Sequence, residues 1–141
     1  MKLSLAFLLI SVFAVSIGAG QSASGRGAGQ NSAISTEEQQ ISNGPVAEYV
    51  SDSNCTIGWS TRASGTMIVR YGTDRNKMAR TSAAVGSKDG RNYHAQLDNL
   101  TPNTRYFFQV FSAGDAISGI GTFQTVAQGD SPVTSKAVIP Q

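Results

Sequence analysis

The fold is decided by the stretch Leu100-Thr101-Pro102-Asn103-Thr104-Arg105-Tyr106-Phe107-Phe108-Gln109-Val110. Pro102 fixes φ and lacks a backbone donor, and Asn103 is a common turn residue, so the first half predicts a sharp chain reversal. After the reversal, Tyr106, Phe108 and Val110 recur at every second position, which is the period of a β-strand. A Tyr at this place predicts a tyrosine corner, in which its hydroxyl bonds to the backbone a few residues upstream.

Four separated blocks of sequence carry a family resemblance. They are Cys55–Thr61, Val69–Thr73, Leu97–Tyr106 and Gly121–Phe123. In this order they make the segment from about Pro45 to Val126 resemble a fibronectin type III domain. The nearest version is the type III-like domain that precedes the catalytic domain in purple acid phosphatases and related bacterial secreted proteins. The resemblance implies structural roles for Trp59, Leu100, Pro102 and Tyr106.

The alternation of apolar residues predicts the same architecture. Short extended segments are expected at 46–50, 55–60, 67–71, 76–81, 92–97, 104–113 and 117–126, with turn residues between them. They predict an all-β fold, a seven-stranded antiparallel two-sheet β-sandwich of fibronectin type III or immunoglobulin-like type. Segment 76–81 is expected at a sheet edge, and the last segment is expected to contact the core through Ile120 and Phe123. The predicted core comprises Ile57, Trp59, Val69, Tyr71, Leu97, Leu100, Tyr106, Phe108, Val110 and Phe123.

The two ends of the chain differ from the middle in composition. Residues 1–20 combine Lys2 with a long apolar run and small residues, which is typical of a secretory signal peptide. A membrane anchor is the alternative, but the run is shorter than the ~20 apolar residues that a spanning helix needs. Residues 21–44 are predicted to form a flexible leader, 45–127 the domain, and 128–141 a disordered tail in which Val138 and Ile139 could dock. The predicted location is secreted, either extracellular or periplasmic.

Charge and cysteine content exclude several classes of protein. Eleven Lys and Arg stand against nine Asp and Glu, a net charge of +2, whereas a general nucleic-acid binder needs clustered cations. The single cysteine, Cys55, cannot form an internal disulfide. Because it alternates with Ile57 and Trp59, we expect a buried and inert thiol.

No catalytic constellation is visible in the sequence. The chain has one histidine, His94, which is out of phase with the inward residues Tyr93 and Ala95 and is therefore expected to point to solvent without a partner. Neither paired carboxylates nor a metal-ligand cluster of His, Cys and Asp is found, so we expect no catalytic residue, metal or cofactor, and no enzyme activity. Gly129-Asp130 superficially resembles the start of a phosphatase metal motif, but no phosphatase ligand can be carried over. Asn54 and Asn99 fit the N-glycosylation pattern, and whether either is modified stays open.

One surface feature suggests binding. The outward positions of the corner strand include Phe107 and Phe111, and those of the 67–71 strand include Ile68 and Arg70. If the two strands are neighbours, as type III order implies, these four residues form a partly apolar patch. The alternative is a patch covered by long Arg stems or by a tail.

These observations predict a binding or spacer module that acts without catalysis. A protein-interaction or surface-assembly role comes first, with an unidentified protein or a second copy as partner. A carbohydrate-binding accessory module comes second, since Phe107, Phe111 and Tyr49 are candidate aromatic contacts for a glycan. A phosphatase-related protein without its catalytic domain comes third.

Overall fold

The computed structural model describes residues 40–135 and 139 of the 141-residue chain, all within one structural unit, 32–141. The expected signal peptide and most of the expected leader lie outside the described residues. Every regular element in the described part is a strand. The strands are β1 (Ile41–Val50), β2 (Cys55–Thr61), β3 (Met67–Gly72), β4 (Arg80–Gly86), β5 (Asn92–Leu97), β6 (Arg105–Ser112), β7 (Asp115–Ala116), β8 (Gly121–Gln124) and β9 (Val133–Thr134).

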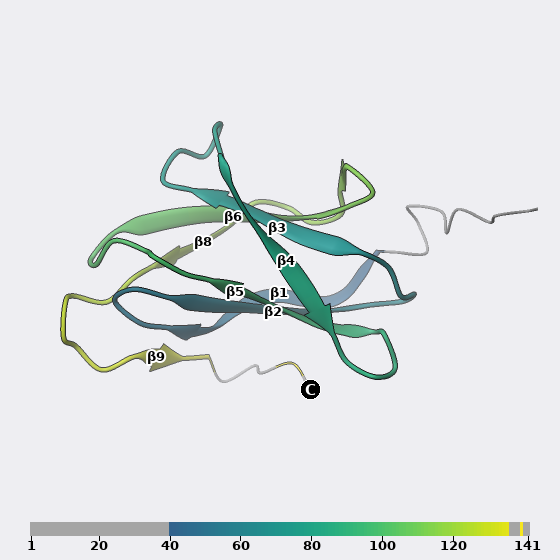
Figure 1. Cartoon of the computed structure of the whole chain (residues 1–141), viewed down its shortest axis with the longest axis horizontal. Coiled ribbons are helices and arrows are strands. Elements are labelled where there is room, and N and C mark those ends of the chain that lie inside the picture. The colour runs from purple at the N-terminus through teal and green to yellow at the C-terminus, as the bar shows by residue number, and fades with distance from the viewer. Residues whose placement is uncertain (1–39, 136–138, 140–141) are drawn as a thin grey trace, which may run out of the picture. The chain divides into compact units, whose positions relative to one another are not determined.

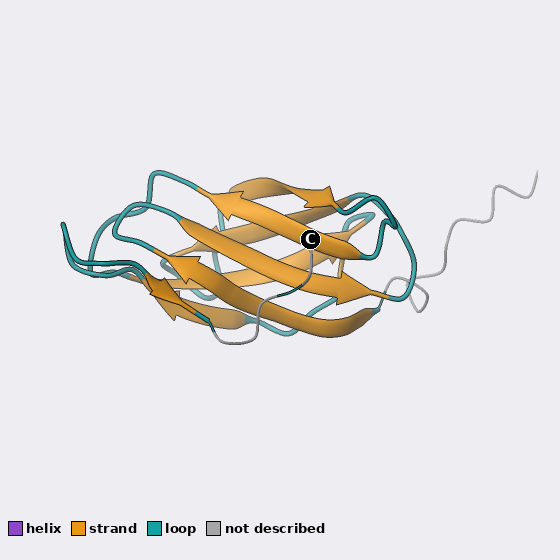
Figure 2. Ribbon diagram, turned by 90° about the horizontal axis from the view of Figure 1, so that it is seen from below, coloured by secondary structure: helices purple, strands orange, loops and turns teal. Residues whose placement is uncertain are grey.

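The described strands form one antiparallel sheet that curls into two layers. Its order is β7-β6-β3-β4-β5-β2-β1-β9, with β8 also paired to β6. Figure 1 shows β4 crossing between the layer of β3 and β6 and the layer of β1, β2 and β5, and Figure 2 shows strands of one layer side by side. The all-β antiparallel, sandwich-like fold is confirmed. The number of strands differs from the seven expected, since nine are described, and the two expected sheets are continuous through β4.

The continuity comes from the pairing of β4. Its first half pairs with β3, where Ile68 lies opposite Ala83, and its second half pairs with β5, where Val85 lies opposite His94. The edge strand expected at 76–81 is therefore wrong in position. Residues 74–77 instead make a turn, in which the Asp74 side chain accepts a hydrogen bond from the backbone N–H of Asn76 (2.8 Å). The small residues of β4 gave no alternating apolar signal by which the strand could be placed.

The core lies between the two layers. All ten predicted core residues are at most 8% exposed, so this prediction is confirmed. Trp59 is fully buried; its ring stacks on Tyr93 with centroids 5.8 Å apart, and its indole N–H points to the sulfur of Met67 at 3.3 Å. Burial of these large side chains supplies most of the favourable free energy of folding.

The chain reversal before β6 has the geometry of a tyrosine corner. The hydroxyl of Tyr106 accepts a hydrogen bond from the backbone N–H of Thr101 (2.9 Å), and its ring is buried against Phe123. Leu100 is buried and Pro102 is half-buried in the turn. Asn103 has a φ of 47°, a left-handed conformation that Asn tolerates better than most residues.

The last strand, predicted at 117–126, is shorter in the structure, where only β8 (Gly121–Gln124) lies within that range and β7 (Asp115–Ala116) precedes it. β7 and β8 both pair with β6, and the residues between them leave the sheet. Ser118 replaces the missing strand partner there, because its hydroxyl accepts the backbone N–H of Val110 (2.9 Å). Ile120 is 37% exposed in this interruption, so the core contact predicted for it is wrong. Phe123 is buried as expected.

The ordered domain extends beyond the predicted boundaries at both ends. β1 begins at Ile41, inside the expected leader, because Ile41 pairs with Thr61 and packs against the core. At the other end, the expected disordered tail includes β9 and the buried Ile139. Both contact β1, and these contacts hold them in place. In the described residues, no helix has the length and apolar character to cross a bilayer.

Candidate functional site

The first candidate surface is the outer face of β3 and β6, which are neighbours as expected. Ile68 lies directly opposite Phe111, and Arg70 lies opposite Gln109. Directly opposed residues of an antiparallel pair share one face, so the structure brings Ile68, Arg70 and Phe111 together. Phe107 lies at the other end of the same strand face, opposite Thr122 of β8. The three apolar side chains are half-buried and Arg70 is exposed.

The register extends the apolar part of this face across four strands. Ala83 of β4 lies opposite Ile68, and Ala116 of β7 lies opposite Phe111. We call Ala83, Ile68, Phe111 and Ala116 the apolar row. The guanidinium carbon of Arg70 lies 4.2 Å from the centre of the Phe111 ring, so a cation–π contact covers part of the row. The guanidinium of Arg70 thus lies over Phe111 and shields part of its ring.

The aromatic residues considered for glycan binding are not all on this face. Phe107 and Phe111 belong to β6, whereas Tyr49 belongs to β1 in the other layer. Between the two phenylalanines, the amide of Gln109 donates to the carbonyl of Ser118 (2.7 Å). These side chains therefore do not form one continuous aromatic platform.

The second candidate surface is the outer face of β1, β2 and β5, and a β-bulge shapes it. Ala47 pairs with Ile57 and Tyr49 with Thr56, so Glu48 is an extra residue in β1. Such a residue changes which face the following side chains occupy. Ala47 and Val50 pack toward the core. The two residues between them, Glu48 and Tyr49, both lie on the outer face.

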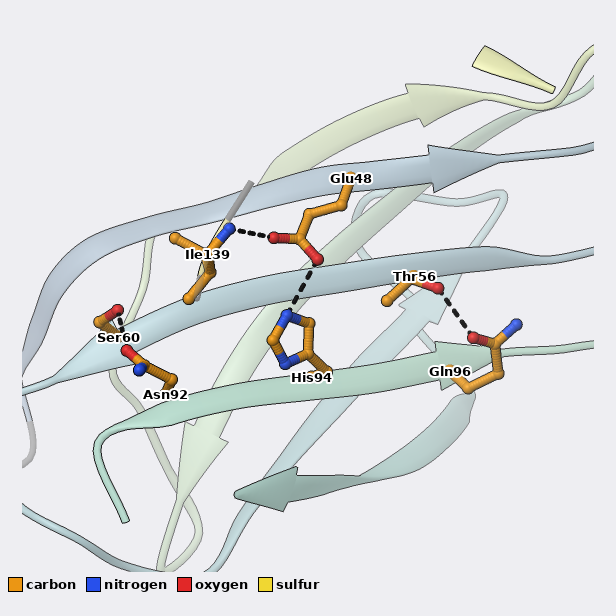
Figure 3. A network of polar contacts seen from close by, with 7 residues as sticks. All are labelled: Glu48, Thr56, Ser60, Asn92, His94, Gln96 and Ile139. Carbon is orange, nitrogen blue, oxygen red and sulfur yellow. Dashed lines mark hydrogen bonds and ion pairs between the residues drawn. The ribbon is translucent and has the colours of Figure 1, made fainter. Parts of the chain in front are cut away.

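Glu48 lies in a recess that sequence analysis did not identify. Its carboxylate lies over Gly58, where a Cβ would come within 2.6 Å of it, and its Oε2 is 3.0 Å from Nε2 of His94. The backbone N–H of Ile139 donates to the other carboxylate oxygen, Oε1 (Figure 3). Glu48 is 7% exposed and Ile139 is 1% exposed. We call the group of Glu48, Gly58 and His94 the Glu48 recess.

His94 differs from its prediction. It lies on the outer face, as its phase indicated, but its side chain is only 15% exposed and it contacts Glu48. The expectation of a solvent-directed histidine without a partner is therefore wrong. The available signal was the irregular phase of residues 46–50, which marks the bulge.

Polar pairs border the recess along β2 and β5. Thr56 donates to the side-chain oxygen of Gln96 (2.8 Å), and Ser60 donates to that of Asn92 (2.7 Å), as Figure 3 shows. On the far side, Val85 lies opposite His94 and is 73% exposed. The recess is thus a small polar site with aliphatic groups at two margins.

The chemistry of this site suits binding of backbone groups. A buried carboxylate accepts N–H donors strongly, and His94 orients it. In the described ranges, no group of three His, Cys, Asp or Glu residues is placed to hold a metal ion. Cys55 is fully buried, and burial raises the pKa of its thiol to about 12, so the thiolate is not formed at neutral pH.

Comparison with known proteins identifies the family. The family model for the N-terminal domain of purple acid phosphatases matches residues 43–125, more than half of the chain. The chain belongs to this family. The part matched corresponds to the N-terminal, non-catalytic domain of purple acid phosphatases, as the four sequence blocks implied.

A solved structure shows the same fold at low sequence identity. The sensor domain of the anti-sigma factor RsgI4 from Pseudobacteroides cellulosolvens is 23% identical, with a TM-score of 0.51; the match covers 72% of this chain and 99% of that domain. A solution structure of the same sensor domain is 20% identical with a TM-score of 0.49, covering 73% and 93% of the two chains. No curated protein matches. At these identities the likeness concerns the fold alone.

Proposed function

We propose that this member of the purple acid phosphatase N-terminal domain family is an exported, fibronectin type III-like binding module that mediates protein–protein interaction in surface assembly. The observation that carries the proposal is the apolar row, which crosses four strands on one outer face. When one face of an antiparallel sheet is exposed to solvent, the side chains on that face are usually polar. A continuous row of Ala, Ile, Phe and Ala therefore favours a contact surface.

The partner that fits this face best is a second copy of the chain. A two-fold contact joins one patch to itself, which suits a row whose two ends carry the same residue, alanine. Arg70 lies beside the row, and a planar guanidinium over an aromatic ring is a common element of interfaces. The net charge of +2 on 141 residues opposes association only weakly. Export rests on the signal-peptide character of residues 1–20.

The test is the oligomeric state of the mature protein, measured by size-exclusion chromatography with light scattering up to high micromolar concentration. We expect a dimer or larger species that is lost when Phe107 and Phe111 are both changed to Ser, and weakened by Arg70→Glu. Val85→Ser is the matched control, because it removes an exposed apolar side chain from the other layer. The unchanged emission of Trp59 will show that each variant is folded.

Each result decides the proposal. Association that both the double variant and Arg70→Glu reduce, but Val85→Ser does not, supports an interface on the apolar row. A wild-type protein that is monomeric at every concentration overturns self-association. Association that all variants retain overturns the assignment of the interface to this face.

A further inference from the structure

We propose that the Glu48 recess and the outer edge of β1 form a peptide-binding site whose ligand is the chain's own C-terminal segment, and that the site can accept the same segment from a second copy. The site lies in the layer opposite the apolar row. The inference therefore does not depend on the proposed function.

The first observation is the backbone pairing. β9 extends the sheet at β1, where Thr134 lies opposite Tyr49 and Val133 opposite Val50. Beyond β9, the backbone N–H of Ser135 donates to the carbonyl of Glu48 (2.8 Å). An extended peptide added to a sheet edge in this manner gains affinity from main-chain hydrogen bonds, whatever its side chains.

The second observation is the recognition of Ile139. Its backbone N–H donates to the carboxylate of Glu48, and its side chain is 1% exposed. A hydrogen bond to an ionised carboxylate is about twice as strong as one between neutral groups. His94 contacts the other carboxylate oxygen at 3.0 Å, so the acceptor is fixed from both sides (Figure 3). The recess thus selects a free N–H next to an aliphatic side chain.

The third observation is that the binding position requires Gly58. Any Cβ there would lie 2.6 Å from the Glu48 carboxylate and would displace it from the sheet surface. A glycine in the interior of a strand weakens the strand and often marks a close approach by another group. Here the approaching group is the acceptor that holds Ile139.

Exchange follows from the small size of the docked segment. β9 is two residues long, and Val133 in it is 59% exposed. The core cluster between the two layers, from Val50 to Phe123, contains neither β9 nor the buried Ile139, so release of the segment would leave that cluster intact. A vacated β1 edge then presents unpaired backbone groups to an identical segment of another molecule.

The first experiment measures occupancy of the site in the full chain. Amide hydrogen exchange followed by NMR should show the Ile139 N–H protected in the wild type and exchanging at least about tenfold faster in Gly58→Ala, since the carboxylate is displaced. Trp59 emission and the core amides of β2 should be unchanged, because the new Cβ meets only the end of a side chain. An Ile139 amide that exchanges at the free-peptide rate in the wild type overturns the proposal.

The second experiment measures exchange in trans. The probe is a fluorescein-labelled peptide of residues 131–141, and its anisotropy is followed as full-length protein is added. In wild type the tethered segment competes at an effective concentration in the millimolar range. Ile139→Asp places a second carboxylate beside Glu48, releases the tethered segment, and should raise the apparent affinity for the peptide at least about tenfold.

The control adds Gly58→Ala to Ile139→Asp, which should abolish the gain in affinity. Equal affinity of wild type and Ile139→Asp would overturn the exchange of the segment. Undiminished binding by the double variant would overturn the Glu48 recess as the site.

Discussion

The hydroxyl of Tyr106 provides the sharpest test of what stabilises the fold. Tyr106→Phe removes one oxygen atom and keeps the ring that stacks on Phe123 with centroids 5.5 Å apart. The lost atom accepts the backbone N–H of Thr101 (2.9 Å), and Tyr106 is 3% exposed. The substitution therefore changes one hydrogen bond and little of the packing.

The expected magnitude follows from the unpaired donor. Tyr106 is buried but Thr101 is exposed, so water can reach the freed N–H and the loss is that of a typical intramolecular hydrogen bond, about 0.5–1.5 kcal/mol. Small domains are stable by about 5–15 kcal/mol, so this is a measurable fraction. For a domain of this size each kcal/mol lowers the melting temperature by about 4–8 °C.

The assay is equilibrium urea unfolding followed by the fluorescence of Trp59, the single tryptophan, which is fully buried in the folded state. Tyr106→Phe should lower the midpoint without changing the dependence of the unfolding free energy on urea. Tyr93→Phe should act similarly, because the Tyr93 hydroxyl accepts from the N–H of Gly65 (2.8 Å) and donates to the carbonyl of Gly90 (2.7 Å). The reasoning is refuted if Tyr106→Phe leaves the midpoint unchanged, or if the 38% exposed Tyr49 gives an equal effect when changed to Phe.

Two further predictions concern the turn at Asp52 and strand β8. The backbone N–H of Gly129 donates to Asp52 and is the main cause that lowers the pKa of this carboxyl below 3.8. Because the pKa of Asp52 is lower in the folded state, its carboxylate stabilises the fold above about pH 4, and this contribution is lost as the pH falls through the folded-state pKa. Asp52→Asn should therefore be less stable than wild type at pH 7, with a difference that shrinks as the pH is lowered below about 4, measured by thermal unfolding. A difference that stays constant as the pH falls would contradict this origin. Gly121→Ala would place a Cβ 2.4 Å from the ring of Phe108 and should cost about 1–3 kcal/mol in urea unfolding, whereas Gly119→Ala, with open space around it, should not.

The parts of the fold that sequence could predict depend on local patterns. The turn at Pro102 and the alternation of Tyr106, Phe108 and Val110 are contained in one short stretch, and period-two alternation around Trp59 is equally clear. Because each pattern is complete within its own segment, the core could be predicted before the strands were paired.

β4 could not be placed in the same way. Its residues include Ser82, Ala83, Ala84 and Gly86, which bury little apolar area and give no period. Its place depends on two different neighbours, β3 for one half and β5 for the other, so the crossing between layers is decided by contacts distant in sequence. The patch around Phe111 needed only the adjacency of β3 and β6, which the resemblance supplied, but the extension of the apolar row needed the register of β4 and β7.

The Glu48 recess was missed because of the feature that creates it. The bulge leaves Glu48 and Tyr49 together on the outer face and returns Val50 to the core, which breaks the alternation by which an inward face is recognised. With strict alternation Tyr49 would point inward and Val50 outward. The extra residue keeps Val50 in the core and still leaves a carboxylate beside the edge where β9 pairs. The sequence could not decide which side chains of β1 point inward. This irregular strand is therefore the one whose backbone pairs with a docked peptide and whose Glu48 carboxylate accepts an N–H of that peptide.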